Sequence, residues 1–301
     1  FMKKKIYMAG CGGMLGEAFH SIFSYDYELK CTDIDVNDTW LEKLDFRSFE
    51  NYFKDVDNFK PDYLFHIGAY TDLEYCEANQ DDTYNTNTKS VENAVNISNK
   101  LDIPIIYIST AGIFDGKKDT FDESDTPVPT SCYATSKYQG ELFVQKNSNK
   151  HLICRAGWMM GGGPNKDKKF IQKIIKQIKD GKKELFIVDD KVGTPTYTYD
   201  FANNLKLLLE NNKWGLFNMV CSGFVSRFDV TKELISILNL ENEIKITEVN
   251  SDYWKREYFV LRPDSECLIN GKLNKLKMNI MRDWKVCLKE YMNKSYKDYL
   301  K

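Results

Sequence analysis

The stretch Gly10-Cys-Gly-Gly13-Met-Leu-Gly16 decides the fold of this chain. An apolar, strand-like segment at residues 5–9 precedes it, and a helical pattern at residues 14–23 follows it. Glycines at 10, 13 and 16 permit a tight turn, close approach of the backbone to a pyrophosphate, and tight packing of helix on strand. The N–H groups and dipole at the start of the helix favour the same anion. This strand–loop–helix unit predicts a dinucleotide-binding fold.

Short apolar strands alternate with helical patterns through the first half of the chain. The predicted strands are residues 5–9, 28–32, 63–67, 103–109 and 151–155. The predicted helices are residues 14–23, 49–56, 84–100 and 132–146. Connections of helix length indicate parallel strands with right-handed crossovers and helices on both faces. The sequence therefore predicts an α/β fold with a doubly wound parallel sheet of the Rossmann type.

The alternation loosens after about residue 155. The later predictions are helices at 168–179, 198–210, 228–238 and 284–299, a strand at 185–188, and a turn at 193–195. We expect residues 1–155 to form an NAD(P)-binding domain, with a returning segment near 190–220. We expect residues 156–301 to form mainly a smaller, mixed α/β substrate-binding domain.

Composition excludes several classes of protein. The 301 residues are 42% hydrophobic and 29% charged, with a formal net charge of −2, which is typical of a globular protein and gives no nucleic-acid footprint. No apolar run reaches the ~18–20 residues of a membrane span. Residues 2–5 lead directly into a strand-like segment, so we expect no signal peptide and a cytoplasmic protein. The eight cysteines and three histidines show no metal-ligand spacing, so we expect reduced, mostly buried cysteines and no metal site.

Asp33 stands at the end of the second predicted strand, downstream of Gly16. A carboxylate at this place would bind the adenosine ribose hydroxyls and repel a 2′-phosphate. No arginine lies beside it, which favours NADH over NADPH while leaving both open. The alternative is a solvated turn, in which Asp is common.

Thr110, Tyr133 and Lys137 are the candidate catalytic residues. Thr110 ends a buried-looking strand, and ligands of open α/β sheets bind beyond the carboxyl ends of the strands. Tyr133 and Lys137 are four apart on a predicted helix, so Lys137 is placed to lower the pKa of the phenol. Thr110 would then bind a carbonyl, Tyr133 would donate its proton, and Lys137 would contact the nicotinamide ribose. The alternatives are a threonine bonded to its own backbone and a tyrosine packed on the sheet.

The order of motifs resembles that of the extended short-chain dehydrogenase/reductases, specifically the dTDP-4-dehydrorhamnose reductase family, over nearly the whole chain. Residues 109–116, Ser-Thr-Ala-Gly-Ile-Phe-Asp-Gly, are similar to the family's Ser-Thr-Asp-Tyr-Val-Phe-Asp-Gly. Residues 68–71, Gly-Ala-Tyr-Thr, resemble its Ala-Ala-Tyr-Thr. The other segments that resemble family motifs are residues 9–16, 44–45, 76–77, 129–141, 155–158, 190–196, 262–263 and 272–273.

The resemblance implies reduction of a 4-keto group on a nucleotide-diphosphate-linked deoxysugar by NADH or NADPH, as in dTDP-rhamnose and polysaccharide biosynthesis. The implied cofactor contacts, besides the three glycines and Asp33, are Met14, Leu15, Asp45, Gly68, Ala69, Tyr70 and Asn87. The implied substrate contacts are Thr71, Glu77, Trp158 and Arg262. Trp158 could instead be a core aromatic and Arg262 a surface arginine. A homodimer is a further possibility.

Three departures from the family pattern lie near the expected sugar. Ala111-Gly112 replaces Asp-Tyr, Ala156-Gly157 replaces Thr-Ser, and His66 replaces an asparagine. The hydride-transfer residues are kept while the substrate side changes. Because hydrogen-bond readout of sugar hydroxyls discriminates strongly, we hypothesise a different 4-keto sugar or a different nucleotide.

Two other functions stay open at this point. A nucleotide-sugar epimerase, or epimerase/reductase, would need additional acid/base residues, for which His66 and Cys132 are the nearby candidates. Some relatives bind NAD(P) as non-catalytic regulatory subunits, such as the partner of methionine adenosyltransferase. The intact Thr110, Tyr133 and Lys137 argue against that second alternative.

Overall fold

A seven-stranded parallel sheet forms the centre of the molecule. The computed structural model describes residues 2–299; residue 1 and residues 300–301, at the outer ends of the two predicted domains, lie outside the described part. The strands of the sheet are β1 Lys5–Ala9, β2 Glu28–Asp33, β3 Leu41–Lys43, β4 Tyr63–His66, β5 Ile105–Thr110, β6 His151–Ala156 and β11 Gly215–Asn218. Their order is β11-β6-β5-β4-β1-β2-β3. The doubly wound α/β prediction is confirmed.

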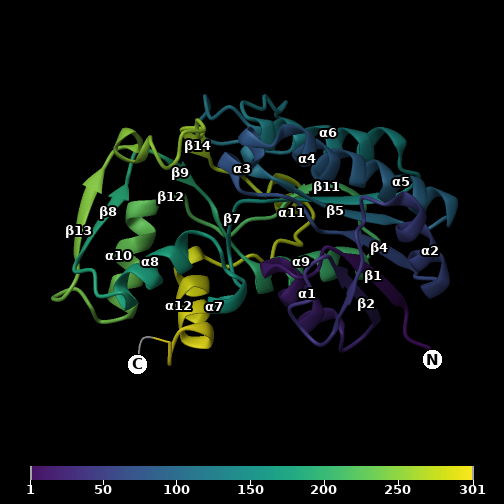
Figure 1. Cartoon of the computed structure of the whole chain (residues 1–301), viewed down its shortest axis with the longest axis horizontal. Coiled ribbons are helices and arrows are strands. Elements are labelled where there is room, and N and C mark those ends of the chain that lie inside the picture. Colours follow the sequence, from purple (N-terminus) through teal and green to yellow (C-terminus); the bar gives the residue numbers. More distant parts are fainter. Residues whose placement is uncertain (1, 300–301) are drawn as a thin grey trace.

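Helices cover both faces of this sheet (Figure 1). On one face lie α1 Met14–Phe23 and α9 Thr198–Glu210; on the other lie α2 Phe49–Phe59, α5 Ser90–Lys100 and α6 Cys132–Asn147. Side chains of β1 alternate between the two cores: Ile6 and Met8 pack with α1 and α9, and Tyr7 packs with α2 and α5. A parallel strand buried on both sides therefore carries the glycine loop at its carboxyl end.

The region that was predicted as one helix over residues 84–100 is divided. After α3 Leu73–Ala78 and α4 Gln80–Tyr84, the chain forms a π-helical turn, η1 Asn85–Lys89, before α5. The wider turn presents Asn87, whose side chain is buried and bonds to the loop after β4. Such π-turns are frequent at functional sites, and an apolar pattern alone does not reveal them.

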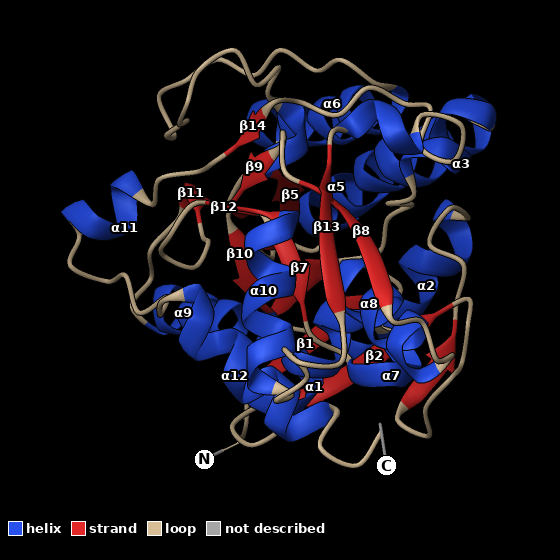
Figure 2. Cartoon of the chain, turned by 90° about the vertical axis from the view of Figure 1, so that its left-hand side faces the viewer, coloured by secondary structure: helices blue, strands red, loops and turns tan. Residues whose placement is uncertain are grey.

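The remaining elements pack at the edge of the sheet or build a smaller part beside it (Figure 2). They are β7 Trp158–Met160, α7 Gly163–Lys166, α8 Phe170–Lys179, β8 Glu184–Val188, β9 Val192–Gly193, β10 Pro195–Tyr197, β12 Val225–Ser226, α10 Arg227–Ile237, β13 Lys245–Val249, β14 Ser265–Glu266, α11 Gly271–Lys275 and α12 Trp284–Ser295, with 3₁₀ turns η2 Ala111–Ile113 and η3 Ser251–Trp254. In Figure 2 the parallel pair β8 and β13 lies in front, next to α10.

The predicted turn at residues 193–195 is wrong in part, because short strands lie on both sides of Thr194. β9 pairs with β12 and β14, and β10 pairs with β7. The backbone of Gly193 packs on the Trp158 ring, where an added Cβ would come within 2.4 Å of the ring. Pairing with strands that are distant in the sequence therefore gives this segment an extended conformation, although its glycine and proline predicted a turn.

A buried ion pair joins α6 to the sheet. Arg155 on β6 donates from Nε to Glu141 Oε2 at 3.0 Å and from a terminal nitrogen to Oε1 at 2.5 Å. Both side chains are almost completely buried, with exposures of 2% and 0%. Breaking a pair of this kind leaves a buried charge without compensation, which is strongly destabilising.

We expect Glu141→Ala to lower the free energy of unfolding by about 3–5 kcal/mol, because the buried Arg155 guanidinium loses its carboxylate. Urea unfolding followed by circular dichroism measures this change. Gln139→Ala on an exposed position of the same helix is the control and should stay within about 0.5 kcal/mol. A loss below about 1 kcal/mol for Glu141→Ala would show that the pair does not hold the helix.

Candidate active site

The glycine loop has the geometry that a pyrophosphate requires. Gly10 has a left-handed φ of 77°, and an added Cβ there would lie 2.2 Å from Gly68 Cα. A Cβ on Gly16 would lie 1.9 Å from the carbonyl oxygen of Cys11, so the helix can approach the loop only with glycine here. At Gly13, by contrast, a Cβ would meet no atom within 4 Å.

The start of α1 fits an anion. Gly13 is the N-cap residue of this helix, and no side chain caps its first turn. Met14 and Leu15 follow with buried side chains, so their backbone N–H groups define the helix start. Uncapped N–H groups beside an open glycine are the donor set that the diphosphate of NADH or NADPH would need.

Asp33 lies at the carboxyl end of β2, beside the glycine loop. Its carboxylate accepts from Gly12 N–H at 2.8 Å and from Asp35 N–H at 3.0 Å. Lys166 of α7 approaches the same place, with Nζ 3.3 Å from Gly12 O and 2.6 Å from a carboxylate oxygen of Asp38. Asp33 was predicted for this place, whereas Lys166 was missed because it is 133 residues away in the sequence.

The loop after β4 contains a second group of residues predicted to bind the cofactor. Asn87 in the π-turn accepts from Tyr70 N–H at 2.8 Å and donates to Tyr70 O at 3.0 Å. The amide thereby holds the loop Gly68-Ala69-Tyr70 in place and continues to Ser136 of α6 at 3.1 Å. Asp45, expected near the adenine, is held by Arg47, which donates from Nε to Oδ1 at 2.9 Å and lowers the pKa of the Asp45 carboxyl.

Thr110 and Tyr133 lie together at the carboxyl end of β5. A Cβ built on Gly112 would be 3.4 Å from Thr110 Oγ1 and 3.5 Å from Tyr133 Cε1. Thr110 Oγ1 accepts from Gly112 N–H at 3.1 Å. The threonine hydroxyl is thereby left to donate toward the Tyr133 oxygen, an interaction that lowers the pKa of the phenol. Two hydroxyl groups therefore face one small space.

The expected effect of Lys137 on Tyr133 is not found. Burial, with a contribution from the Glu266 carboxylate, raises the pKa of Tyr133 to about 12, although Thr110 opposes the shift. Lys137 is buried and points to the sheet, where Nζ donates to Ile108 O at 2.7 Å and lies 4.5 Å from the centre of the Tyr107 ring. Burial lowers the pKa of Lys137 to about 7. The helical spacing was right, but the ammonium group bonds to backbone beneath the phenol.

Trp158 belongs to a polar cluster that the sequence did not indicate. Its Nε1–H donates to Glu266 Oε2 at 2.9 Å, and the Arg227 guanidinium stacks 3.8 Å from a ring centre of the indole. The other carboxylate oxygen, Glu266 Oε1, lies 3.4 Å from the Cβ position of Gly112. Glu266 and Arg227 were missed because each lies in an unremarkable local pattern, far along the chain from Trp158.

Three predicted substrate residues have protein partners in this structure. Thr71 Oγ1 accepts from Lys169 Nζ at 2.7 Å, and Glu77 accepts from the N–H of Cys132 at 3.0 Å, at the start of α6. The Arg262 guanidinium forms a forked ion pair with Glu74, with one branch at 2.8 Å. Thr71 and Arg262 therefore lie in charged clusters, while Glu77 supports the helix that carries Tyr133.

The two residues considered for epimerase chemistry do not provide an acid or base. His66 is 1% exposed and hydrogen-bonds to Tyr52 and Ser90, and burial lowers its pKa to about 3. Ser90 donates to Thr86 O, so the imidazole donates from Nε2 and accepts at Nδ1. Burial also raises the pKa of the Cys132 thiol. His66 thus replaces an asparagine as a structural side chain.

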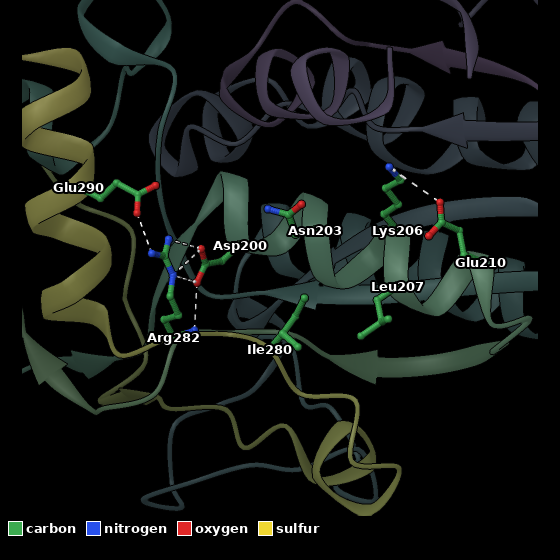
Figure 3. Close-up of a pocket in the computed structure, with 8 residues that line it drawn as sticks. All are labelled: Asp200, Asn203, Lys206, Leu207, Glu210, Ile280, Arg282 and Glu290. Atoms are coloured by element: carbon green, nitrogen blue, oxygen red, sulfur yellow. Dashed lines mark hydrogen bonds and ion pairs between the residues drawn. The ribbon is translucent and has the colours of Figure 1, made fainter. Parts of the chain in front are cut away.

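A separate surface cavity of about 530 Å³ lies between α9 and the segment before α12 (Figure 3). Arg282 binds Asp200 through Nε and Nη2 and reaches Glu290 at 2.7 Å, and Lys206 contacts Glu210 at 3.8 Å. The charged side chains of its wall are therefore paired with one another within the protein. Its lining contains none of the residues predicted for the active site.

No helix within residues 2–299 combines the length and apolar character that crossing a bilayer requires. In the same range, no three histidine, cysteine, aspartate or glutamate side chains are grouped as they would be around a metal ion.

The comparison with known proteins agrees with this geometry. Residues 4–297 match the family model described as the RmlD substrate binding domain. The chain is 26% identical over 299 residues to a dTDP-4-dehydrorhamnose reductase of Aggregatibacter actinomycetemcomitans, covering 95% of this chain and 97% of that protein. The crystal structure of a dTDP-4-dehydrorhamnose reductase from Yersinia enterocolitica has a TM-score of 0.86 and 31% identity, with 97% and 99% coverage.

The same fold occurs in a dTDP-4-dehydrorhamnose reductase from Bacillus anthracis, crystallised in complex with NADP. The TM-score is 0.88 at 24% identity, and the match covers 98% of this chain and 100% of that one. With the family model matched over almost the entire length, the chain belongs to the dTDP-4-dehydrorhamnose reductase family.

Proposed function

We propose that this protein is a reductase that uses NADH or NADPH to reduce the 4-keto group of a nucleotide-diphosphate sugar. The observation that carries the proposal is the pair Thr110 and Tyr133, whose side chains face one space at the carboxyl end of β5. Membership of the reductase family supports the choice of substrate class. The division of labour follows: residues 1–155 and a returning segment hold the cofactor, and residues 156–301 mainly hold the sugar nucleotide.

Each residue has a task in this reaction. The bound cofactor supplies the hydride. Thr110 donates a hydrogen bond that polarises the ketone, and Tyr133 donates its phenolic proton to the oxygen as the hydride arrives. A pKa of about 12 keeps Tyr133 protonated at neutral pH, as a proton donor must be. Lys137 anchors the helix through its bond to Ile108 O and would contact the nicotinamide ribose of a bound cofactor. Because Tyr133 donates its proton as the carbonyl is reduced, no free alkoxide forms.

The substrate side carries positive charge suited to a diphosphate. Burial lowers the pKa of Lys169 to about 8, and the nearby Lys173 and Arg227 lower it in the same direction. Binding of a diphosphate would offset this repulsion. We propose that Arg262, which is paired with Glu74, supports this cluster. We also propose that Trp158 packs on the sugar.

Turnover of dTDP-4-dehydrorhamnose, compared with other 4-keto nucleotide sugars, tests the function. Oxidation of NADH or NADPH is followed by absorbance and the product by mass spectrometry. We expect stoichiometric ketone reduction, with a substrate other than the namesake preferred because Gly112 and Gly157 replace side chains of the family pocket. Full activity on the namesake would contradict this substrate preference, and no turnover of any ketone would contradict the reductase assignment.

We expect Tyr133→Phe to lower kcat by about 10²–10⁴ because the proton donor is lost. Cofactor affinity, measured by fluorescence titration, should change less than about twofold. Tyr138→Phe, a tyrosine on the same helix that packs in a separate cluster, is the matched control and should keep full activity. NADH oxidation that survives Tyr133→Phe unchanged would favour the non-catalytic alternative.

We expect Asp33 and Lys166 to act in opposite directions on cofactor choice. Asp33→Asn removes the negative charge beside the ribose and should raise the NADPH/NADH ratio of kcat/KM by about tenfold. Lys166→Met removes the nearby cation and should lower the same ratio. Steady-state kinetics with both cofactors measure the two ratios, and a shift of both variants in one direction would refute the assignment.

The buried Lys137 predicts a pH dependence of stability. Its pKa is about 7 when folded and about 10.4 when unfolded, so the unfolded chain binds the extra proton between these values. The free energy of unfolding should therefore rise with pH from about 7 to 10, by on the order of 1 kcal/mol per pH unit relative to Lys137→Met. Urea unfolding measures the free energy of unfolding of both proteins at several pH values. A difference between the two proteins that stays constant from pH 7 to 9 would contradict this prediction.

A further inference from the structure

Glu266 places a carboxylate oxygen beside the two hydroxyl groups that face the ketone. Its Oε1 lies 3.4 Å from the Cβ position of Gly112, as does Thr110 Oγ1, and Tyr133 Cε1 lies 3.5 Å from it. The side chain is half-buried and comes from β14, which is remote in sequence from β5 and α6. Three functional groups from three elements thus surround one small space.

Rigid contacts hold this carboxylate in place. Glu266 Oε2 accepts from Trp158 Nε1–H at 2.9 Å, which turns Oε1 toward Gly112. β14 pairs with β9, and the backbone of Gly193 in β9 packs on the Trp158 ring. Figure 2 shows β14, β9 and β12 as neighbours at the edge of the smaller part. A group fixed in this way can discriminate between ligands, because it does not shift to fit a ligand that lacks a matching hydrogen-bond donor.

Charge around Glu266 is balanced without a hydrogen bond to Oε1 in the described residues. Burial raises the pKa of the Glu266 carboxyl, and Trp158, Arg227 and Arg262 act in the opposite direction. The Arg227 guanidinium lies over the indole ring of Trp158, 3.8 Å from its centre. Oε1 is therefore an acceptor placed where a ligand can supply the donor.

The chemistry of a 4-keto sugar selects the position that is read. A group next to Thr110 and Tyr133 meets the carbons bonded to the carbonyl carbon, C3 and C5. In a 6-deoxy sugar C5 carries the ring oxygen and a methyl group, and neither donates a hydrogen bond. C3 carries a hydroxyl or an amino group, and both donate.

We propose that Glu266 is a specificity-determining residue that accepts a hydrogen bond from a hydroxyl or amino group on C3 of the 4-keto sugar. The inference rests on the reductase function proposed above. Gly112 takes part by leaving open the space through which the substituent reaches Oε1. The family has a tyrosine at the position of Gly112, and its phenol would occupy this space. The replacement by glycine is therefore consistent with a substituent that enters here.

Paired kinetics on three ketones test the proposal: 3-hydroxy, 3-amino and 3-deoxy forms of a dTDP-linked 4-keto-6-deoxy sugar. Glu266→Ala should lower kcat/KM about tenfold to a hundredfold on substrates that carry a C3 donor, mainly through KM, and leave the 3-deoxy form unchanged within about twofold. Glu248→Gln, on an exposed position of β13, is the control and should change none of the three.

Glu266→Gln identifies the donor and serves if the alanine variant fails to fold. Its amide oxygen can take the Trp158 N–H, which turns the NH₂ toward the ligand. A hydroxyl can accept from this NH₂, whereas an ammonium group cannot. Selective loss of the 3-amino substrate therefore indicates an amino sugar, and loss of the 3-hydroxy substrate by Glu266→Ala with partial rescue by Gln indicates a hydroxyl.

Other results separate the two proposals. If the wild-type protein reduces the 3-deoxy ketone as well as the others, or if Glu266→Ala lowers all three equally, Glu266 does not read C3 and the reductase function stands. If the wild-type protein reduces none of the ketones, the reductase function fails and the assignment of Glu266 falls with it.

Discussion

The position of the proton donor depends on how α6 is fastened to the sheet. Lys137 donates from Nζ to Ile108 O, and Tyr107 donates its hydroxyl hydrogen to Lys137 O, so one residue is bonded to β5 at both ends. One turn later the Glu141–Arg155 pair repeats the connection to β6. Because all these groups are buried, leaving any of them without its partner would strongly destabilise the folded protein. These bonds fix the orientation of α6 about its own axis. In this orientation Tyr133 lies beside Thr110.

The proposed reaction and the proposed recognition of the sugar depend on two different parts of the fold. In the function proposed here, proton donation and cofactor binding would use groups at the carboxyl ends of neighbouring parallel strands, where ligands of doubly wound sheets bind. In the function proposed here, readout of the sugar would use Trp158 and Glu266, which the short strands β7 and β14 hold. Substitutions in the second group can change the substrate while the hydride chemistry stays intact. The Ala111-Gly112 departure lies at the border of the two groups.

Regular elements were predictable where one periodicity dominated. Predicted strands 5–9 and 151–155 and predicted helix 14–23 agree with β1, β6 and α1 to within one residue. The two strands are short apolar runs buried on both faces, and the helix has one apolar face against one core. The π-turn at Asn85–Lys89 was not predictable from an apolar pattern, and its Asn87 bonds to Tyr70, 17 residues earlier in the chain. Short strands at Val192–Gly193 and Pro195–Tyr197 exist through pairing with β7, β12 and β14, against the local turn signal.

The sequence by itself determined the strand–glycine loop–helix unit and the doubly wound sheet, because local spacing decides these features. It also predicted residues that would meet a dinucleotide and a ketone, on the basis of motifs at strand ends. Only the tertiary structure decided the direction of Lys137 toward Ile108 O, the engagement of Arg262 with Glu74, the bond of Glu266 to Trp158, and the approach of Lys166 to Gly12. Each of these joins residues far apart in the chain. Burial, which sets the pKa values of Tyr133 and Lys137, is a property of the packed molecule and cannot be read from helical spacing.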